Sequence, residues 1–207
     1  NDWTPQMRAL LVALEQWVIR DVPPPPSQIP ALADGTLEEA NAASIGWPSI
    51  PGVTYNARLN TLPLVDFGPQ FDAQNMTGVA GPPRLVPEKQ YKVLVPKVDE
   101  DGNEIAGIRS PWITVPTATH TGWNLQSAAF AEGQLCSNTG SYIPLRPTKA
   151  DRLAAGDPRL SLEERYPDHA AYVAAVKKAV EDLLARRLLL PDDAAIIMKQ
   201  AEANAVP

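Results

Sequence analysis

The sequence has few of the residues that most often carry chemistry or cross-links. Its 207 residues include one cysteine, Cys136, and two histidines, His120 and His169. A single cysteine excludes an internal disulfide and any cysteine-based zinc site. Two histidines without HExxH-like spacing give no support for a transition-metal site, so we expect neither a metal nor a cofactor.

Positive charge and long apolar runs are also scarce. There are 18 Lys and Arg against 24 Asp and Glu, a formal net charge of −6, and no basic cluster. The electrostatic footprint of a nucleic-acid-binding protein is therefore missing. No apolar run approaches the ~18 residues that a membrane-spanning helix needs. We expect no nucleic-acid partner and no membrane span.

Proline, by contrast, is abundant. It accounts for 22 of the 207 residues, about twice the average share of roughly 5%. Because proline fixes φ and lacks an N–H donor, the chain should be rich in loops and sheet edges. Residues 23–90 open with four prolines and continue as short apolar runs between Pro and Gly. They predict an extended arm laid over structure that this chain does not supply.

A helix is predicted from Thr4-Pro5 to about Arg20, ending before the proline run. Its apolar residues recur at the spacing of one buried helical face: Met7, Leu10, Leu11, Leu14, Trp17 and Val18. Trp17 is a candidate interface residue on this face.

The C-terminal third is predicted to be helical. Ser161 and Glu164 have the spacing of a capping box, and Asp168 is placed to cap the helix that follows. The apolar stripe of that helix is Tyr172, Val173, Val176, Ala179, Val180, Leu183 and Leu184. A last helix begins at Pro191, so we predict an α-hairpin.

A β-hairpin is predicted between Tyr91–Val98 and Glu104–Arg109, with the turn sequence DEDGNE between the strands. Asp99, Asp101 and Asn103 alternate as the first ligands of a calcium loop do. However, glycine and glutamate are missing from the sixth and twelfth positions of that motif, and the flanks are strand-like. A plain hairpin turn is the favoured interpretation.

The segment PTATHTGWNLQS, residues 116–127, holds the densest cluster of reactive side chain types. His120 is the one candidate catalytic base, but no carboxylate or nucleophile adjoins it in the sequence. A loop histidine near an interface or cleft is the favoured interpretation. Trp123 is predicted to be a buried anchor, and Asn124 to satisfy backbone groups of the loop.

No serine lies on the G-x-S-x-G elbow that exposes a hydrolase nucleophile. The nearest match, around Ser141 in residues 139–142, lacks the second glycine. Cys136 has no helix start or basic neighbour to lower its pKa, so we interpret it as structural. A self-contained hydrolase that uses Cys136 or Ser141 with His120 remains an alternative.

Several sequence segments, taken in their order along the chain, resemble the sequences of a known family. They are RALLVALEQWV, PPPPSQIPALADGTL, YKVLVPKVDEDGNEIAGIR, TGWNL, GSYIP and GDPRLSLEERY. Together they resemble the C-terminal part of a bacterial family known as alpha/beta hydrolase domain-containing proteins, over residues 5 to 200. The resemblance implies an exported protein and a triad histidine just before the last helix of the sheet. The helix at Thr4 resembles that last helix, and the family more commonly has tyrosine at the position of His120.

The sequence thus predicts a mixed α/β, loop- and proline-rich fold. Residues 1–22 would be the last helix of a hydrolase-type core, 23–90 a proline-rich arm, 91–147 the β-hairpin and TGWN region, and 148–207 a helical segment. The start at Asn1 rather than Met predicts a processed product or a piece of a longer protein.

The predicted function is the C-terminal portion of an α/β-hydrolase-like protein that packs on, and partly covers, a serine-hydrolase core. That core would act on a small-molecule ester or related acyl compound. The catalytic portion would be another chain or a preceding part of the same chain, and no triad residue would lie here. Trp123, Asn124 and Trp17 are the candidate cleft or interface residues. A stand-alone extracellular binding or structural module is the alternative, and it requires a closed core without a large exposed apolar patch.

Overall fold

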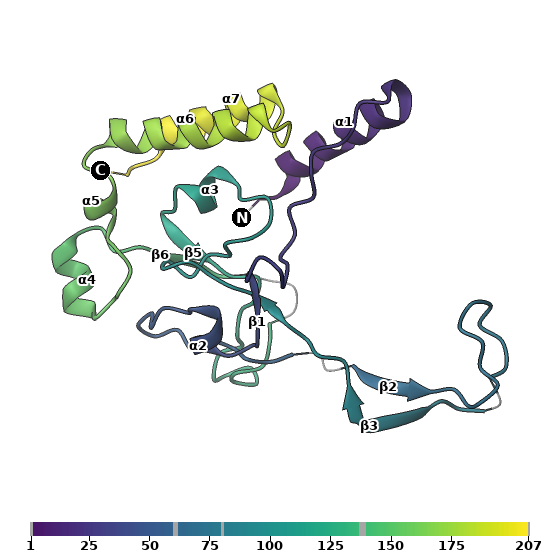
Figure 1. Ribbon diagram of the computed structural model, residues 1–207. Helices are drawn as coiled ribbons and strands as arrows, with labels where there is room; N and C mark the ends of the chain where they lie inside the picture. Colours follow the sequence, from purple (N-terminus) through teal and green to yellow (C-terminus); the bar gives the residue numbers. More distant parts are fainter. Residues whose placement is uncertain (1, 60–61, 80, 137–139, 207) are drawn as a thin grey trace.

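The computed structural model describes residues 2–59, 62–79, 81–136 and 140–206. Figure 1 shows a body that contains α3 to α7 and the β5–β6 pair, from which α1 and the β2–β3 hairpin project. In chain order the elements are α1 (Thr4–Arg20), β1 (Leu37–Glu38), α2 (Ala42–Ile45), β2 (Pro63–Asp66), β3 (Arg84–Gln90), β4 (Val95–Pro96), α3 (Pro111–Thr114), β5 (Ala118–His120), β6 (Tyr142–Pro144), α4 (Lys149–Ala155), α5 (Leu162–Arg165), α6 (His169–Ala185) and α7 (Pro191–Ala203).

The strands form three separate pairs, all antiparallel: β1 with β4, β2 with β3, and β5 with β6. Within the described residues no two strands run parallel. The fold is mixed α/β, as predicted, but the described residues contain no parallel sheet of the kind around which α/β folds are built.

The hydrophobic core lies around α6 and α7, which pack side by side as the predicted α-hairpin (Figure 1). Asp168 Oδ1 accepts a hydrogen bond from Ala171 N and caps α6. The predicted stripe is confirmed, with Tyr172 and Val176 fully buried. The capping box is also confirmed: Ser161 and Glu164 each accept from the other's backbone N–H at the start of α5. The sequence signals and the tertiary packing agree in this region.

Helix α1 forms as predicted, but it buries a different face. Trp3 rather than Thr4 is the N-cap residue. The buried side chains are small or polar, Gln6, Ala9 and Ala13, and the two alanines line a shallow pocket with Leu189 and Leu190. Of the predicted face only Leu10 packs against the core. The remaining members are exposed: Met7, Leu11, Leu14, Trp17 and Val18.

Polar contacts fix this orientation of α1. Arg8 forms an ion pair with the buried Asp193 of α7, with Nε 3.0 Å from Oδ2. Arg187 donates to Gln16 Oε1 at 2.9 Å and to the carbonyl of Pro23 at 2.9 Å. Periodicity identified the apolar face of α1, and the described residues of this chain leave most of that face exposed.

The predicted hairpin between Tyr91–Val98 and Glu104–Arg109 was mostly wrong. Only the turn and a single bridge between Val98 and Glu104 form. Val95 and Pro96 pair instead with the arm strand β1. Asp99 Oδ1 accepts from the backbone N–H groups of Asp101 and Asn103, and this closes the turn before a second strand can extend.

The described residues of the segment 23–90 form an extended arm with short strands and turns, in agreement with the sequence pattern. The arm also contains α2, which was not predicted. Asn41 Oδ1 caps this helix by accepting from Ser44 N, and Gly46 ends it at φ +79°.

Arg159 is the centre of a buried polar network beside β5 and β6. It forms an ion pair with Asp157, and both side chains are 2% exposed. Nε and Nη2 donate to the two Asp157 oxygens at 3.0 and 2.7 Å. The other three donors reach Thr119 Oγ1 at 2.8 Å and the carbonyls of Ile143 and Pro144 at 3.0 and 3.2 Å. All five guanidinium N–H groups thus have acceptors.

We expect Arg159→Ala to lower the free energy of unfolding of the native protein by about 3–5 kcal/mol, because Asp157 is left as a buried, unpaired charge. Urea unfolding measures this. The matched control is Lys177→Ala, which breaks an exposed pair with Glu181 and should cost no more than about 1 kcal/mol. An equal, small effect of the two substitutions would contradict the role of Arg159.

Candidate functional site

His120 ends β5 rather than lying in a free loop. Its register partner is Tyr142 of β6, and its ring packs edge-on against the Tyr142 ring at 5.3 Å. Its backbone N–H donates to Asn103 Oδ1 at 2.8 Å. Residues 118–120 of the predicted polar loop are therefore a strand, because Asn103 and β6 both satisfy backbone groups of β5.

The His120 imidazole is half-buried, and this desolvation lowers its pKa to about 4. The ring is therefore neutral at neutral pH. Within the described part of the chain it has no hydrogen bond or ion pair with a carboxylate or hydroxyl. The side chain can accept or donate one hydrogen bond, but no orienting acid or nucleophile makes it a general base here.

Two cavities share the wall that contains His120. One, of about 410 Å³, lies on the side of Trp3 and Arg109. The other, of about 220 Å³, lies on the side of Tyr55 and Trp123. Both are lined by Glu104, His120, Thr121 and Gly122.

Trp123 packs in a cluster with two aromatic residues of the arm. Its ring centroid lies 5.7 Å from that of Trp47 and 6.0 Å from that of Tyr55. Trp123 is half-buried, so it is an anchor within this chain that also faces a cavity. Sequence reasoning did not identify Trp47 and Tyr55 as site residues. The sequence signal that could have indicated them is the presence of two aromatic residues in the short segment GWPSIPGVTY, residues 46–55.

Asn124 holds the loop after Trp123. Its Oδ1 accepts from Leu125 N at 2.8 Å, and its carbonyl accepts from Cys136 N at 2.8 Å. The side-chain hydrogen bond agrees with the predicted role in satisfying loop backbone groups. Trp17 is 51% exposed on α1 and lines neither cavity. The roles of Trp123, Asn124 and Trp17 in a cleft or interface stay predictions.

Within the described residues, neither of the two alternative nucleophiles, Ser141 and Cys136, forms a hydrogen bond with the His120 ring. Ser141 Oγ donates to the carbonyl of Trp123 at 3.2 Å, and Ser141 N donates to Thr121 Oγ1 at 3.0 Å. Cys136 is a half-buried free thiol. Residue 139 of the nearest elbow match lies outside the described residues. Ser141 therefore serves as a loop hydrogen-bonding residue in this structure.

The acidic turn at residues 99–103 pairs with arginines. Asp99 Oδ2 lies 2.5 Å from Arg109 Nη2, and Asp101 forms an ion pair with Arg165. Together with the backbone hydrogen bonds to Asp99, these pairs account for the turn as a structural element. Among the described residues no group of three or more His, Cys, Asp or Glu is arranged to hold a metal ion. The helices in that part of the chain also include none long and apolar enough to cross a membrane.

Comparison with known proteins identifies the class. A family model described as an alpha/beta hydrolase domain matches residues 1–199. The chain therefore belongs to the alpha/beta hydrolase domain family, as the ordered phrases indicated. Comparison with curated proteins and with solved structures found no match.

The His120 ring should titrate with a midpoint near pH 4, well below the ordinary 6.5. Because the unfolded chain takes up this proton first, the free energy of unfolding should fall as the pH drops from about 6.5 to about 4. NMR of the ring protons measures the midpoint, and His120→Gln should remove this part of the pH dependence. A ring midpoint at or above 6.5 would show that the imidazole is solvated.

Proposed function

We propose that this chain is the C-terminal portion of a hydrolase that packs on, and partly covers, a serine-hydrolase core. The core is either another chain or a preceding part of the same polypeptide. It acts on an ester or related acyl bond of a small molecule. Family membership supports hydrolase chemistry, and the arrangement of α1 supports the division of roles.

The observation that carries the proposal is the exposed apolar face of α1. Leu11 and Trp17 are 61% and 51% exposed, and their neighbours at helical spacing are exposed as well. Helices of α/β folds bury such a face on a parallel sheet. The described residues supply no parallel strand pair, so the sheet that covers α1 belongs to the core. A self-contained binding module does not account for this face.

The absence of a nucleophile elbow from the sequence fits this division. The core would supply a serine that attacks the acyl carbonyl, a histidine that takes the serine proton, and an acid that orients the histidine. Departure of the alcohol or amine would leave an acyl-enzyme that water hydrolyses. No triad residue is assigned to this chain.

This chain would contribute a wall of the substrate cleft. The wall consists of Glu104, His120, Thr121 and Gly122, and Tyr55 and Trp123 of the aromatic cluster line the smaller cavity beside it. Apolar surface next to one neutral imidazole suits the uncharged acyl or alcohol part of an ester. His120 would position a substrate polar atom by one hydrogen bond.

A fluorophosphonate probe tests the proposed chemistry, because it phosphonylates an activated serine and releases fluoride. In the native protein we expect one labelled serine, and peptide mapping should place it outside residues 1–207. Loss of ester hydrolysis should parallel the labelling. Label on Ser141 would instead establish the self-contained alternative, and the absence of any label would remove the serine mechanism.

Trp123→Ala should raise KM for a p-nitrophenyl ester by about three- to tenfold, because an aromatic contact in the cleft wall is lost. The value of kcat should stay within about twofold of wild type. Phe130→Ala is the matched control, since Phe130 is an exposed aromatic residue of the same region that lines neither cavity. Equal KM values for the two variants would exclude Trp123 from the cleft.

A further inference from the structure

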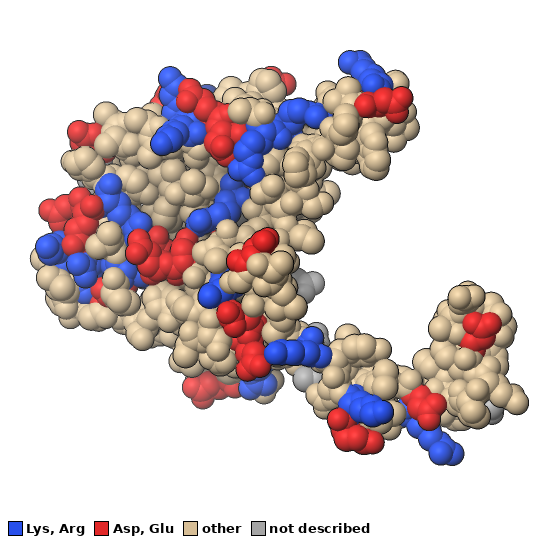
Figure 2. Space-filling view, viewed as in Figure 1, with Lys and Arg blue, Asp and Glu red and all other residues tan. Residues whose placement is uncertain are grey.

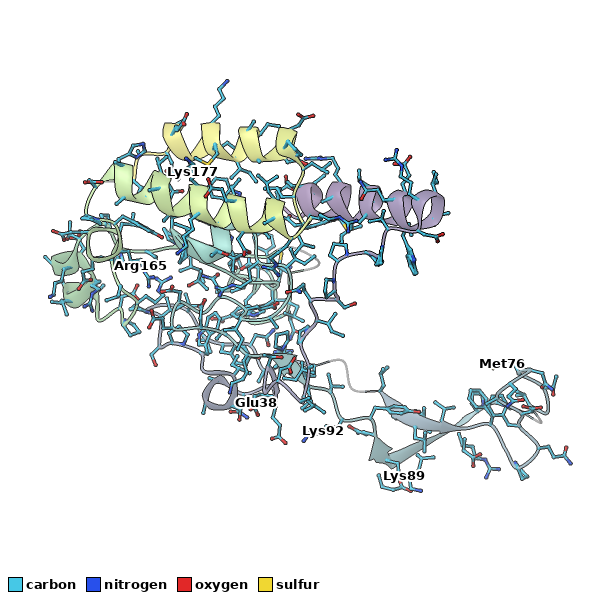
Figure 3. The ribbon with its side chains drawn as sticks, turned by 45° about the horizontal axis from the view of Figure 1, so that its top comes forward. Glu38, Met76, Lys89, Lys92, Arg165 and Lys177 are labelled. Atoms are coloured by element: carbon cyan, nitrogen blue, oxygen red, sulfur yellow. The ribbon has the colours of Figure 1, made fainter. Side chains whose placement is uncertain are left out.

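The β2–β3 hairpin projects from the body, and no other element of the described chain packs on it. Among the described residues its strands pair only with each other, and Figures 1 and 3 both show it extending away from the body. Met76, at its far end in Figure 3, is 67% exposed. A two-stranded hairpin alone in water is marginally stable at best, so this one needs a surface to pack on.

One face of the hairpin is suited to such packing. Val65 and Leu85 are register partners, and their side chains therefore share one face. The next pair, Asp66 and Arg84, is charged and lies on the opposite face, which it shares with the pair Leu64 and Val86. Leu85 is 63% exposed, which leaves the apolar face open to solvent.

Residues 67–78 of the loop at the end of the hairpin already have a defined shape. The Phe67 and Phe71 rings stack with centroids 4.5 Å apart, and Asp72 N donates to the carbonyl of Thr77 at 3.0 Å. Gly78, at φ +78°, approaches the backbone of Gln70 too closely for any Cβ. A preformed loop loses little conformational entropy on docking.

The position of the hairpin relative to α1 indicates what covers it. Figure 2 shows an open hollow bounded by α1 on one side and by the hairpin on the other. The views of Figures 1 and 3 agree that both project from the same side of the body. The family match over residues 1–199 places both within one alpha/beta hydrolase domain.

We infer that the hairpin is a second docking arm, whose Val65–Leu85 face packs on the same hydrolase core that α1 covers. The core thus sits in the hollow and is held from two sides. This inference rests on the proposed function. It adds a specific contact, since a core held by α1 alone would leave the hairpin in solvent.

Hydrogen exchange of the native protein tests the inference. Backbone amides of α1 and of both hairpin strands should exchange at least about tenfold more slowly than in unstructured peptides, and the two elements should keep or lose this protection together when the protein is diluted. Leu85→Gln should restore fast exchange at the hairpin alone. Arg84→Gln is the matched control, because it introduces the same side chain at the neighbouring position on the opposite face of the hairpin, and it should leave the protection within about twofold.

The other outcomes separate this inference from the proposed function. Protection of α1 with a fast-exchanging hairpin overturns the second arm and leaves the proposed function standing. Fast exchange in both α1 and the hairpin overturns both this inference and the proposed function. Hairpin protection that disappears on dilution while α1 stays protected identifies a second copy of the chain as the occupant and also overturns the inference, as does equal loss of protection in the two variants.

Discussion

The buried guanidinium of Arg159 is the interaction on which the rest of this structure depends. A charged guanidinium group with almost no solvent contact is stable only if each of its N–H donors has a hydrogen-bond acceptor. Here the acceptors come from Asp157, from Thr119 on β5, and from two carbonyls of β6. The network extends from Thr119, which donates to the carbonyl of Asp101, to the ion pair of Asp101 with Arg165. It therefore connects the acidic turn, the β5–β6 pair and the start of the helical segment.

The same network places the candidate site. Asn103 bonds to the carbonyl of Ala118 at 3.1 Å and accepts from His120 N. This contact holds the end of β5, where the TGWN loop begins. Phrases that are far apart in the sequence, such as VDEDGNE, TGWNL, GSYIP and GDPRLSLEERY, meet at this point. Their polar residues hold the wall that presents the His120 imidazole to both cavities and Trp123 to the smaller one.

Local signals in the sequence predicted the helical segment well. In α6 the cap at Asp168 and the apolar stripe act within one helix, and the buried face packs on α7 of the same chain. The partner of β4 could not be predicted, because β1 lies more than fifty residues earlier and no local pattern encodes that pairing. The α-helical period of α1 was equally clear. Periodicity shows which side chains of α1 are apolar and need to be buried, but it does not show which part of the protein buries them. In this structure that face is exposed.

For the site, sequence reasoning identified His120, Trp123 and Asn124 as neighbours, but not the two arm aromatics that complete the cluster. Trp47 and Tyr55 reach Trp123 only after the arm folds back over the TGWN loop, so their proximity is tertiary. The pKa of His120 is also a tertiary property, since it depends on burial at the end of β5. Sequence spacing alone could exclude an elbow serine, but it could not locate the cavities.

The central claim is that a hydrolase core covers the apolar face of α1. The most direct test is a crystal structure of the native protein, read at Leu11 and Leu14. The account predicts that both side chains are buried against a mostly parallel sheet that lies outside residues 1–207. A native protein in which this face is open to solvent, or is covered by a second copy of α1, would contradict it.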